Sequence, residues 1–236
     1  MPNLDDFAPF DPSARRQADK TRYPGADVDV LYDRRRCMHA AECGRAAAGV
    51  FNARRSPWIS PDAAAADAVT AVIHRCPTGA LQAVRDDAIV PPPLPETNEV
   101  VVSPEGPLYL SGRILVEDED GGSDDMQHRV ALCRCGASRN KPYCDSSHGK
   151  IRFRDAGGVA SDAAAAQREP GDVKVKAIPD GPLMVSGPMT LRAASGRIAA
   201  TKSRLFLCRC GNSKNKPYCD GAHKTVGFRS VDGDGR

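Results

Sequence analysis

The feature that most constrains the fold of this 236-residue chain is an internal repeat at one constant offset. Cys133 recurs as Cys208, 75 residues later, and the landmarks around it keep that spacing. The landmark pairs are Gly106-Pro107-Leu108 with Gly181-Pro182-Leu183, Ser111-Gly112 with Ser186-Gly187, Gly121 with Gly196, and Phe153-Arg154 with Phe228-Arg229. A repeat of this kind indicates a duplicated domain, and we place its copies at residues 98–155 and 173–230.

Each copy is predicted to be a small antiparallel β unit. In the first copy, the apolar segments Val100–Val102 and Leu108–Leu110 flank Pro104-Glu105-Gly106-Pro107, a composition typical of a turn. A third apolar segment, Val130–Leu132 or Leu205–Leu207, runs directly into a loop rich in cysteine. Units of this size bury little apolar surface and usually need a further constraint.

The cysteine-rich loops each carry four potential metal ligands. These are Cys133, Cys135, Cys144 and His148 in the first copy, and Cys208, Cys210, Cys219 and His223 in the second. Both sets follow the spacing C-x-C-x8-C-x3-H, and 11 of the 13 positions from Cys133 to Asp145 are identical in the second copy. Residues 133–148 are named the first cysteine loop, and residues 208–223 the second cysteine loop.

Metal ligation is the use that best fits these cysteines. The chain has nine cysteines, an odd number, and structural disulfides are rare in cytosolic proteins. Three thiolates and one imidazole suit a [2Fe-2S] cluster, with the tight C-x-C pair on one iron and the other two ligands on the second. The four ligands alone also allow a structural zinc site. Because a ligating histidine must be deprotonated, we expect acid to release the clusters.

Basic residues flank the ligands in both loops. They are Arg134, Arg139 and Lys141 in the first loop and Arg209, Lys214 and Lys216 in the second. Cations beside a cluster favour its reduction, but the expectation for each single residue is a solvated surface position.

The two loops resemble the signature of the CDGSH, or NEET, iron-sulfur proteins, C-x-C-x2-[ST]-x3-P-x-C-D-G-[SAT]-H. The second loop matches throughout, whereas the first has Ser146 where the family has glycine, and a positive φ there would strain a serine. The resemblance implies a β-rich fold that holds two [2Fe-2S] clusters. The duplication then implies that the two copies pack as a covalent pseudo-dimer. Asp145 and Asp220 are candidates to cap short helices beside the third cysteine.

A third set of cysteines lies in a separate N-terminal domain. Its landmarks are Cys37, Cys43, Pro57-Trp58-Ile59 and Cys76-Pro77. They resemble the divergent single-cluster ferredoxin domain, and the resemblance covers residues 27–85. Bacterial ferredoxins have a cysteine where this chain has Ala40, so three thiolates remain. They suit a [3Fe-4S] cluster, or a [4Fe-4S] cluster whose fourth iron binds water or another side chain such as His39; a degenerate fold without a cluster is the alternative.

Local patterns predict the elements of this first domain. Alternating Val28, Val30 and Tyr32 indicate a strand. Ser60 as N-cap and Pro61 in the first turn predict the start of a helix. The predicted buried face of that helix carries Ala65, Val69, Val72 and Ile73.

Two segments have the composition of linkers. Val90–Pro95 contains four prolines and predicts a semi-rigid spacer after the first domain. Ala156–Gly171, rich in alanine, glycine and acidic residues, lies between the two copies. If this segment is flexible, its reach allows the copies to pack together.

Charge and hydropathy exclude several functions. The net charge of +3 arises from interspersed residues without a basic stripe, so we expect no nucleic-acid partner. Apolar segments are too short to span a membrane. Residues 1–10 lack the basic and apolar regions of a signal peptide, so the expected location is cytoplasmic.

Together these features predict an α+β protein with a small ferredoxin-like N-terminal domain followed by two β-rich CDGSH domains. We expect a monomer that is not an enzyme, because no nucleophile–base pair, phosphate loop or dinucleotide fingerprint occurs. It would pass electrons to redox partner proteins, or clusters to apo-acceptors, in iron or redox homeostasis. A zinc-stabilised structural or interaction module is the alternative, and an enzyme that uses the open iron site of the N-terminal cluster is a third possibility.

Overall fold

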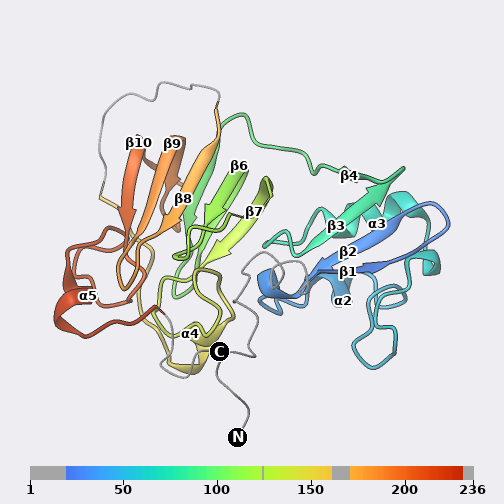
Figure 1. Cartoon of the computed structure of the whole chain (residues 1–236), viewed down its shortest axis with the longest axis horizontal. Helices are drawn as coiled ribbons and strands as arrows, with labels where there is room; N and C mark the ends of the chain where they lie inside the picture. Colours follow the sequence, from blue (N-terminus) through green and yellow to red (C-terminus); the bar gives the residue numbers. More distant parts are fainter. Residues whose placement is uncertain (1–19, 124, 161–170, 231–236) are drawn as a thin grey trace, which may run out of the picture.

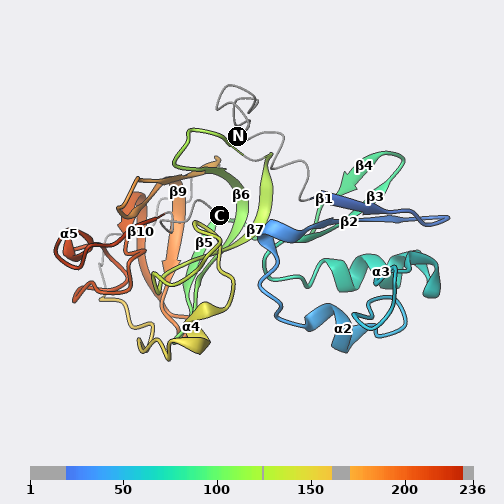
Figure 2. The same ribbon diagram turned by 60° about the horizontal axis from the view of Figure 1, so that its bottom comes forward.

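The computed structural model describes residues 20–123, 125–160 and 171–230, which form two β-sheets (Figure 1). The N-terminal sheet is antiparallel, with strand order β1-β2-β3-β4. Its elements are β1 (Lys20–Tyr23), β2 (Asp29–Asp33), η2 (Arg34–Arg36), α2 (Glu42–Ala46), η3 (Pro61–Ala63), α3 (Ala66–Ile73), β3 (Leu81–Arg85) and β4 (Ala88–Val90). Helices α2 and α3 lie on the same face of this sheet (Figure 2).

The main helix of the N-terminal domain begins later than the sequence predicts. Ser60 and Pro61 start the 3-10 helix η3 instead, and Ser60 makes no side-chain capping hydrogen bond. The backbone is extended at Ala64 (φ −153°, ψ 166°) before α3 begins. Three residues of the predicted face are buried: Val69, Val72 and Ile73. Ala65, which precedes the helix, is exposed.

The second sheet combines strands from both copies of the repeat. They are β5 (Glu99–Val102), β6 (Leu108–Glu117), β7 (Gln127–Leu132), β8 (Val173–Ala177), β9 (Leu183–Arg192) and β10 (Ile198–Leu207). Within each copy the neighbouring strands are antiparallel, as predicted. Between copies, β5 pairs in parallel with β9, and β6 pairs in parallel with β8. The antiparallel units are therefore not self-contained, because the opening strand of each copy also pairs with the other copy.

One apolar core serves both copies. Its buried members include Val100 and Leu110 from the first copy and Val185 and Leu207 from the second. Alternate residues along β6 point into this core, as the two-residue period of a strand requires. The cysteine loops therefore emerge from a single folded body.

Part of the predicted linker between the copies is packed against this body. Val159 is 4% exposed, and its carbonyl oxygen accepts a hydrogen bond from Nη2 of Arg197 at 2.7 Å. The start of this segment is therefore held against the second sheet. Residues 161–170 of the segment lie outside the described residues.

The predicted spacer after the first domain is shorter than expected. Val90 pairs with Ala83 and ends β4, so it belongs to the N-terminal sheet. Residues 91–95 then lead from β4 towards the second sheet (Figure 1).

The helices in the described part of the chain are short. α3 has eight residues, while α4 (Ser147–Lys150) and α5 (Ala222–Thr225) are single turns at the ends of the cysteine loops. None of the helices in residues 20–123, 125–160 and 171–230 is long and apolar enough to cross a membrane.

Candidate metal centres

Each cysteine loop arranges its four predicted ligands as two pairs. In the first loop, Sγ of Cys133 lies 3.8 Å from Sγ of Cys135, and Sγ of Cys144 lies 3.4 Å from Nδ1 of His148. In the second loop the pairs are Cys208 with Cys210 at 3.7 Å and Cys219 with His223 at 3.4 Å. Among the described residues, no group of three or more His, Cys, Asp or Glu side chains surrounds a single ion position. Two pairs per loop suit two metal atoms with two protein ligands each.

Backbone hydrogen bonds fix the first loop onto the end of β7. The N–H of Cys133 donates to the carbonyl oxygen of Pro142 at 2.8 Å, and the N–H of Cys144 donates to Ala131 at 2.9 Å. The same bonds recur in the second loop, from Cys208 to Pro217 and from Cys219 to Phe206. The sheet itself therefore sets the positions of the ligands.

Asp145 and Asp220 precede the N-cap residues of the short helices, Ser146 and Gly221, and their carboxylates bond the first helical N–H and also close the loops. Oδ1 of Asp145 accepts the N–H of Ser147 at 2.9 Å, at the start of α4. Its Oδ2 accepts the N–H of Arg139 at 3.0 Å, across the loop. Asp220 makes the equivalent bonds with Ala222 and Lys214. Each carboxylate therefore links the middle of its loop to the turn that carries the histidine.

The first cysteine of each loop is placed to carry negative charge. A hydrogen bond from the thiol of Cys135, together with backbone N–H groups, lowers the pKa of Cys133 to about 6 against the effect of burial. Cys208 has its pKa lowered to about 6 in the same way by Cys210. The pKa values of Cys135 and Cys210 are raised, because each donates its proton to the neighbouring sulfur and is partly buried. Burial also raises the pKa of Cys144 to about 12. A cationic metal centre would compensate the charge of all three thiolates.

His148 has the protonation state that metal binding needs. Burial lowers its pKa, and the nearby guanidinium of Arg134 acts in the same direction, while Asp145 opposes them. The imidazole is therefore neutral at neutral pH, so a ring nitrogen is free to bind a metal.

Arg134, between the first two cysteines, is 1% exposed, so the expectation of a solvated side chain is wrong for it. Its Nε donates to the carbonyl oxygen of Gly106 at 3.0 Å, and Nη2 donates to Ser103 at 2.5 Å. The guanidinium also pairs with Asp155 and lies 5.1 Å from the ring centroid of Phe153. Arg134 therefore ties the loop to the turn between β5 and β6.

Arg209 has the same role in the second loop and is also 1% exposed. Its Nε and Nη2 donate to the carbonyl oxygens of Gly181 and Ile178. Its Nη1 lies 2.6 Å from Oε1 of Glu119, a residue of the first copy. This ion pair joins the two copies next to the second metal site.

Gly136 and Gly211 bring the two loops into contact. A Cβ on Gly136 would lie 2.5 Å from the carbonyl oxygen of Cys210, and a Cβ on Gly211 would lie 2.5 Å from that of Cys135. Both residues also have positive φ, at 83° and 79°. Because only glycine fits there, each loop passes directly against the second cysteine of the other.

The three N-terminal cysteines line one cavity of about 540 Å³. Cys37 follows η2, Cys43 lies in α2, and Cys76 follows α3. Tyr32 and Trp58 line the same cavity, and their rings meet edge to face with centroids 5.0 Å apart. A cavity walled by three thiols and aromatic rings fits an inorganic cluster that is partly shielded from water.

Two further side chains lie beside these thiols. Nδ1 of His39 is 3.9 Å from Sγ of Cys37, and His39 is exposed with a φ of 58°. Oγ1 of Thr78 is 3.6 Å from Sγ of Cys76, and Thr78 is buried. Sequence reasoning missed Thr78 because a hydroxyl two residues after a cysteine matches no ligand spacing. Both side chains can therefore hydrogen-bond a sulfur of this site, and His39 also has a ring nitrogen that can bind a metal.

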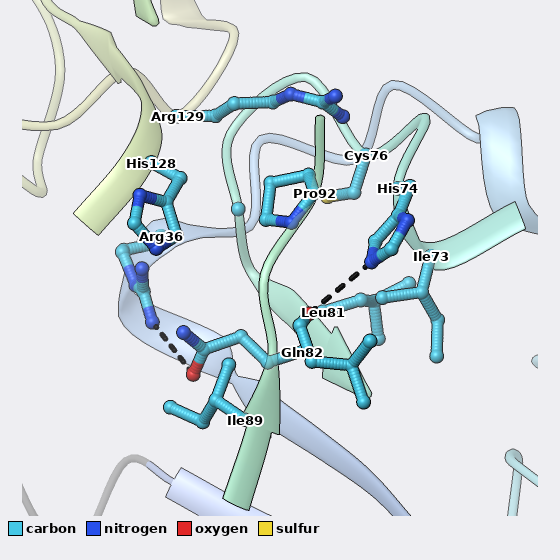
Figure 3. A pocket seen from close by; sticks show the side chains of 12 residues that line it. Arg36, Ile73, His74, Cys76, Leu81, Gln82, Ile89, Pro92, His128 and Arg129 are labelled. Carbon is cyan, nitrogen blue, oxygen red and sulfur yellow. Dashed lines mark hydrogen bonds between the residues drawn. The ribbon is translucent and has the colours of Figure 1, made fainter. Parts of the chain in front are cut away.

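A crevice between the N-terminal sheet and β7 places a basic side chain near the third thiol (Figure 3). Cys76 and His74 line it from the N-terminal domain, and His128 and Arg129 line it from β7. Burial lowers the pKa of Arg129, whereas the charge of Cys76 raises it. The second sheet thus adds positive charge to the surroundings of the N-terminal site.

Family comparisons cover all three groups of cysteines. Residues 23–86 match a family described as a divergent 4Fe-4S mono-cluster domain. Residues 105–149 and 180–224 each match a family described as an iron-binding zinc finger of the CDGSH type. The matched ranges contain every cysteine and histidine singled out from the sequence.

Two curated relatives share part of the chain. Both are named uncharacterized protein YjdI, one from Escherichia coli K12 and one from Escherichia coli O157:H7. Each is 40% identical over 60 residues, which is 25% of this chain and 79% of the relative. No solved structure shows a significant match.

Proposed function

The chain contains two CDGSH-type iron-binding domains and a divergent 4Fe-4S mono-cluster domain, and on this basis we propose that it carries electrons one at a time between redox partner proteins. It accepts an electron from one redox partner protein and passes it to another, or it hands a cluster to an apo-acceptor. The observation that carries this proposal is the pairing of ligand atoms in each loop. Two close pairs of donors suit a cluster of two irons. We assign it no reaction on a small substrate.

The residues of each loop hold and tune the bound group. A [2Fe-2S] cluster supplies a one-electron centre, whose potential a histidine ligand raises. In the first loop, the C-x-C pair would hold one iron, and Cys144 with His148 would hold the other. The backbone N–H of Ser146 points at Sγ of Cys144 at 3.4 Å, and such bonds stabilise negative charge on the sulfur. Phe153 packs on the C-x-C pair and keeps water from it.

The N-terminal cavity holds the third group in this proposal. Cys37, Cys43 and Cys76 would hold a cluster of the 4Fe type, or of the 3Fe type if the fourth position stays open. His39 lies beside the sulfur of Cys37 and Thr78 lies beside the sulfur of Cys76. A ferredoxin-like role for this domain follows from the same ligands.

We further propose that the two CDGSH copies act as a covalent pseudo-dimer. Three features support this arrangement: the reciprocal contacts of Gly136 and Gly211, the parallel pairings between copies, and the shared core. Both [2Fe-2S] sites then lie in one chain, and a second chain is not needed to complete either site.

The experiment that tests this function is a redox titration of the full chain, purified without oxygen and followed by visible absorbance and EPR. Reversible uptake of one electron per cluster supports the carrier role. A colourless zinc protein, or clusters that bleach irreversibly on reduction, contradicts it. Mixing the oxidised protein with an apo-ferredoxin then separates the two modes, because cluster transfer moves iron and sulfide to the acceptor and electron transfer does not.

A further inference from the structure

The segment after the first N-terminal cysteine is packed directly against the first cysteine loop. Met38 is 7% exposed and lies in one apolar cluster with Ala131 and Cys144. The hydroxyl of Tyr109 donates to Sδ of Met38 at 3.6 Å. Because Met38 follows Cys37 in the chain, the neighbour of one candidate ligand is buried against another candidate ligand.

Ser146 completes a connection between the two sites. Its Oγ donates to the carbonyl oxygen of Met38 at 2.6 Å, and its backbone N–H donates to Sγ of Cys144 at 3.4 Å. Met38 is joined to Cys37 by a peptide bond. Two hydrogen bonds and a short covalent stretch therefore lead from a thiol of the N-terminal site to a thiol of the first loop.

Arg35 anchors this contact. Its guanidinium lies 5.1 Å from the ring centroid of Tyr143 and pairs with Asp118. Its carbonyl oxygen accepts a hydrogen bond from Nδ2 of Asn140. All three partners belong to the first copy, so the N-terminal domain is docked specifically on that copy.

The second loop has no equivalent connection in the part of the chain that the structure describes. Gly221 stands at the position of Ser146 and keeps the N–H···Sγ bond to Cys219 at 3.4 Å. A Cβ on Gly221 would have no atom within 4 Å. Phe206, at the position of Ala131, is 48% exposed. The serine that departs from the family pattern thus marks the loop that contacts the N-terminal site.

We propose that Met38 and Ser146 form an electron-transfer contact between the N-terminal site and the first cysteine loop. With clusters in both sites, one electron would pass along it: the N-terminal centre would be oxidised by one electron, and the [2Fe-2S] centre of the first loop would be reduced by one. No proton or other reactant takes part, and the electron enters the chain from a one-electron reductant. This inference rests on the proposed function, because both sites must hold clusters.

The direct test compares Ser146→Gly with Gly221→Ser in the full, iron-loaded chain. Glycine is the residue that the second loop carries at this position, so Ser146→Gly is expected to fold and to bind iron normally. Reduced methyl viologen is mixed rapidly with each protein in less than one equivalent. Freeze-quenched EPR then follows how the electron redistributes between the signals of the N-terminal and [2Fe-2S] centres. Redistribution should be several-fold slower in Ser146→Gly and unchanged in Gly221→Ser.

A second variant and a second measurement keep the test decisive. Ser146→Ala removes the hydroxyl but keeps Cβ, so it should slow redistribution as Ser146→Gly does. It serves as the test variant if Ser146→Gly binds less iron. In the fully reduced wild-type protein, spin–spin broadening between the N-terminal and [2Fe-2S] signals is expected. Wild-type rates in both Ser146 variants, or no broadening, overturn the contact while the proposed function stands. Protein without reducible clusters overturns the proposed function instead.

Discussion

Ser146 and Gly221 occupy equivalent positions in the two cysteine loops and share a left-handed backbone, with φ of 68° and 88°. This conformation costs a residue with a Cβ about 1 kcal/mol, and it costs glycine little. Ser146 offsets that cost with its hydrogen bond to Met38, a bond of about 1 kcal/mol. Gly221 has no neighbour that could compensate a side chain in the same way.

The two reciprocal substitutions should therefore differ in their effect on stability. Gly221→Ser should lower the free energy of unfolding by about 1 kcal/mol, because the strain has no compensating bond. Ser146→Gly should change it by less than about 0.5 kcal/mol, since relieved strain and the lost bond nearly cancel. Denaturant unfolding of the iron-loaded proteins measures both. Equal destabilisation by the two substitutions would show that the Met38 contact does not compensate Ser146.

Arg134 should be essential to the stability of the first loop. Arg134→Gln breaks a buried ion pair and leaves backbone carbonyls without donors, so it should lower the free energy of unfolding by about 3 kcal/mol. Arg139→Gln is the matched control, because Arg139 lies in the same loop but is exposed, and its effect should stay within about 0.5 kcal/mol. Comparable losses in the two variants would contradict a clamping role for Arg134.

The histidine ligands should make the clusters sensitive to acid. A neutral imidazole binds iron and protonation removes it, so visible absorbance should be lost as pH falls from about 6.5 to about 5. Because burial lowers the pKa of His148, the first cluster should begin to lose its absorbance only below the pKa of a free imidazole. His148→Cys should protect the first cluster and lower its potential, since a thiolate adds negative charge.

His223→Cys is the matched variant for the second loop. Each single variant should retain part of the absorbance in acid, and the double variant should retain nearly all of it. Acid bleaching that is unchanged in the double variant would exclude the histidines as ligands.

Arg129 should raise the reduction potential of the N-terminal centre. Its charge faces Cys76 across the crevice between the sheets, so it stabilises the added electron. Arg129→Gln should lower the reduction potential of the N-terminal centre by about 40 mV for a one-electron couple. This shift corresponds to on the order of 1 kcal/mol of lost stabilisation. Arg204→Gln, the exposed equivalent in the second copy, should leave this potential unchanged. An EPR-monitored titration compares them, and equal potentials in the two variants would count against the role of Arg129.

The sequence predicted those parts of the molecule that are determined by residues close together in the chain. The ligand loops follow from cysteine spacing, and the strand positions follow from short apolar segments beside turn residues. The partner of each strand does not follow, because an alternating pattern shows which face is buried and not which neighbour is bonded. The parallel pairing of β5 with β9 was therefore missed.

The burial of Arg134 shows a second limit of sequence reasoning. Its main partners are the backbone carbonyl oxygens of Ser103 and Gly106, which any residue could provide. Only folding brings these oxygens to Arg134, a charged side chain that the sequence alone places in water. Similarly, Ser60 and Pro61 carry helix-start signals that the short η3 satisfies before the backbone extends again.

The measurement that tests the central claim most directly is the iron, acid-labile sulfide and zinc content of the full chain, purified without oxygen. Two [2Fe-2S] centres predict about four irons per chain with sulfide in equal amount, and an N-terminal cluster raises the iron to about seven or eight. The protein should be red-brown and contain little zinc. Stoichiometric zinc without sulfide or colour would contradict the redox account and leave a structural metal protein.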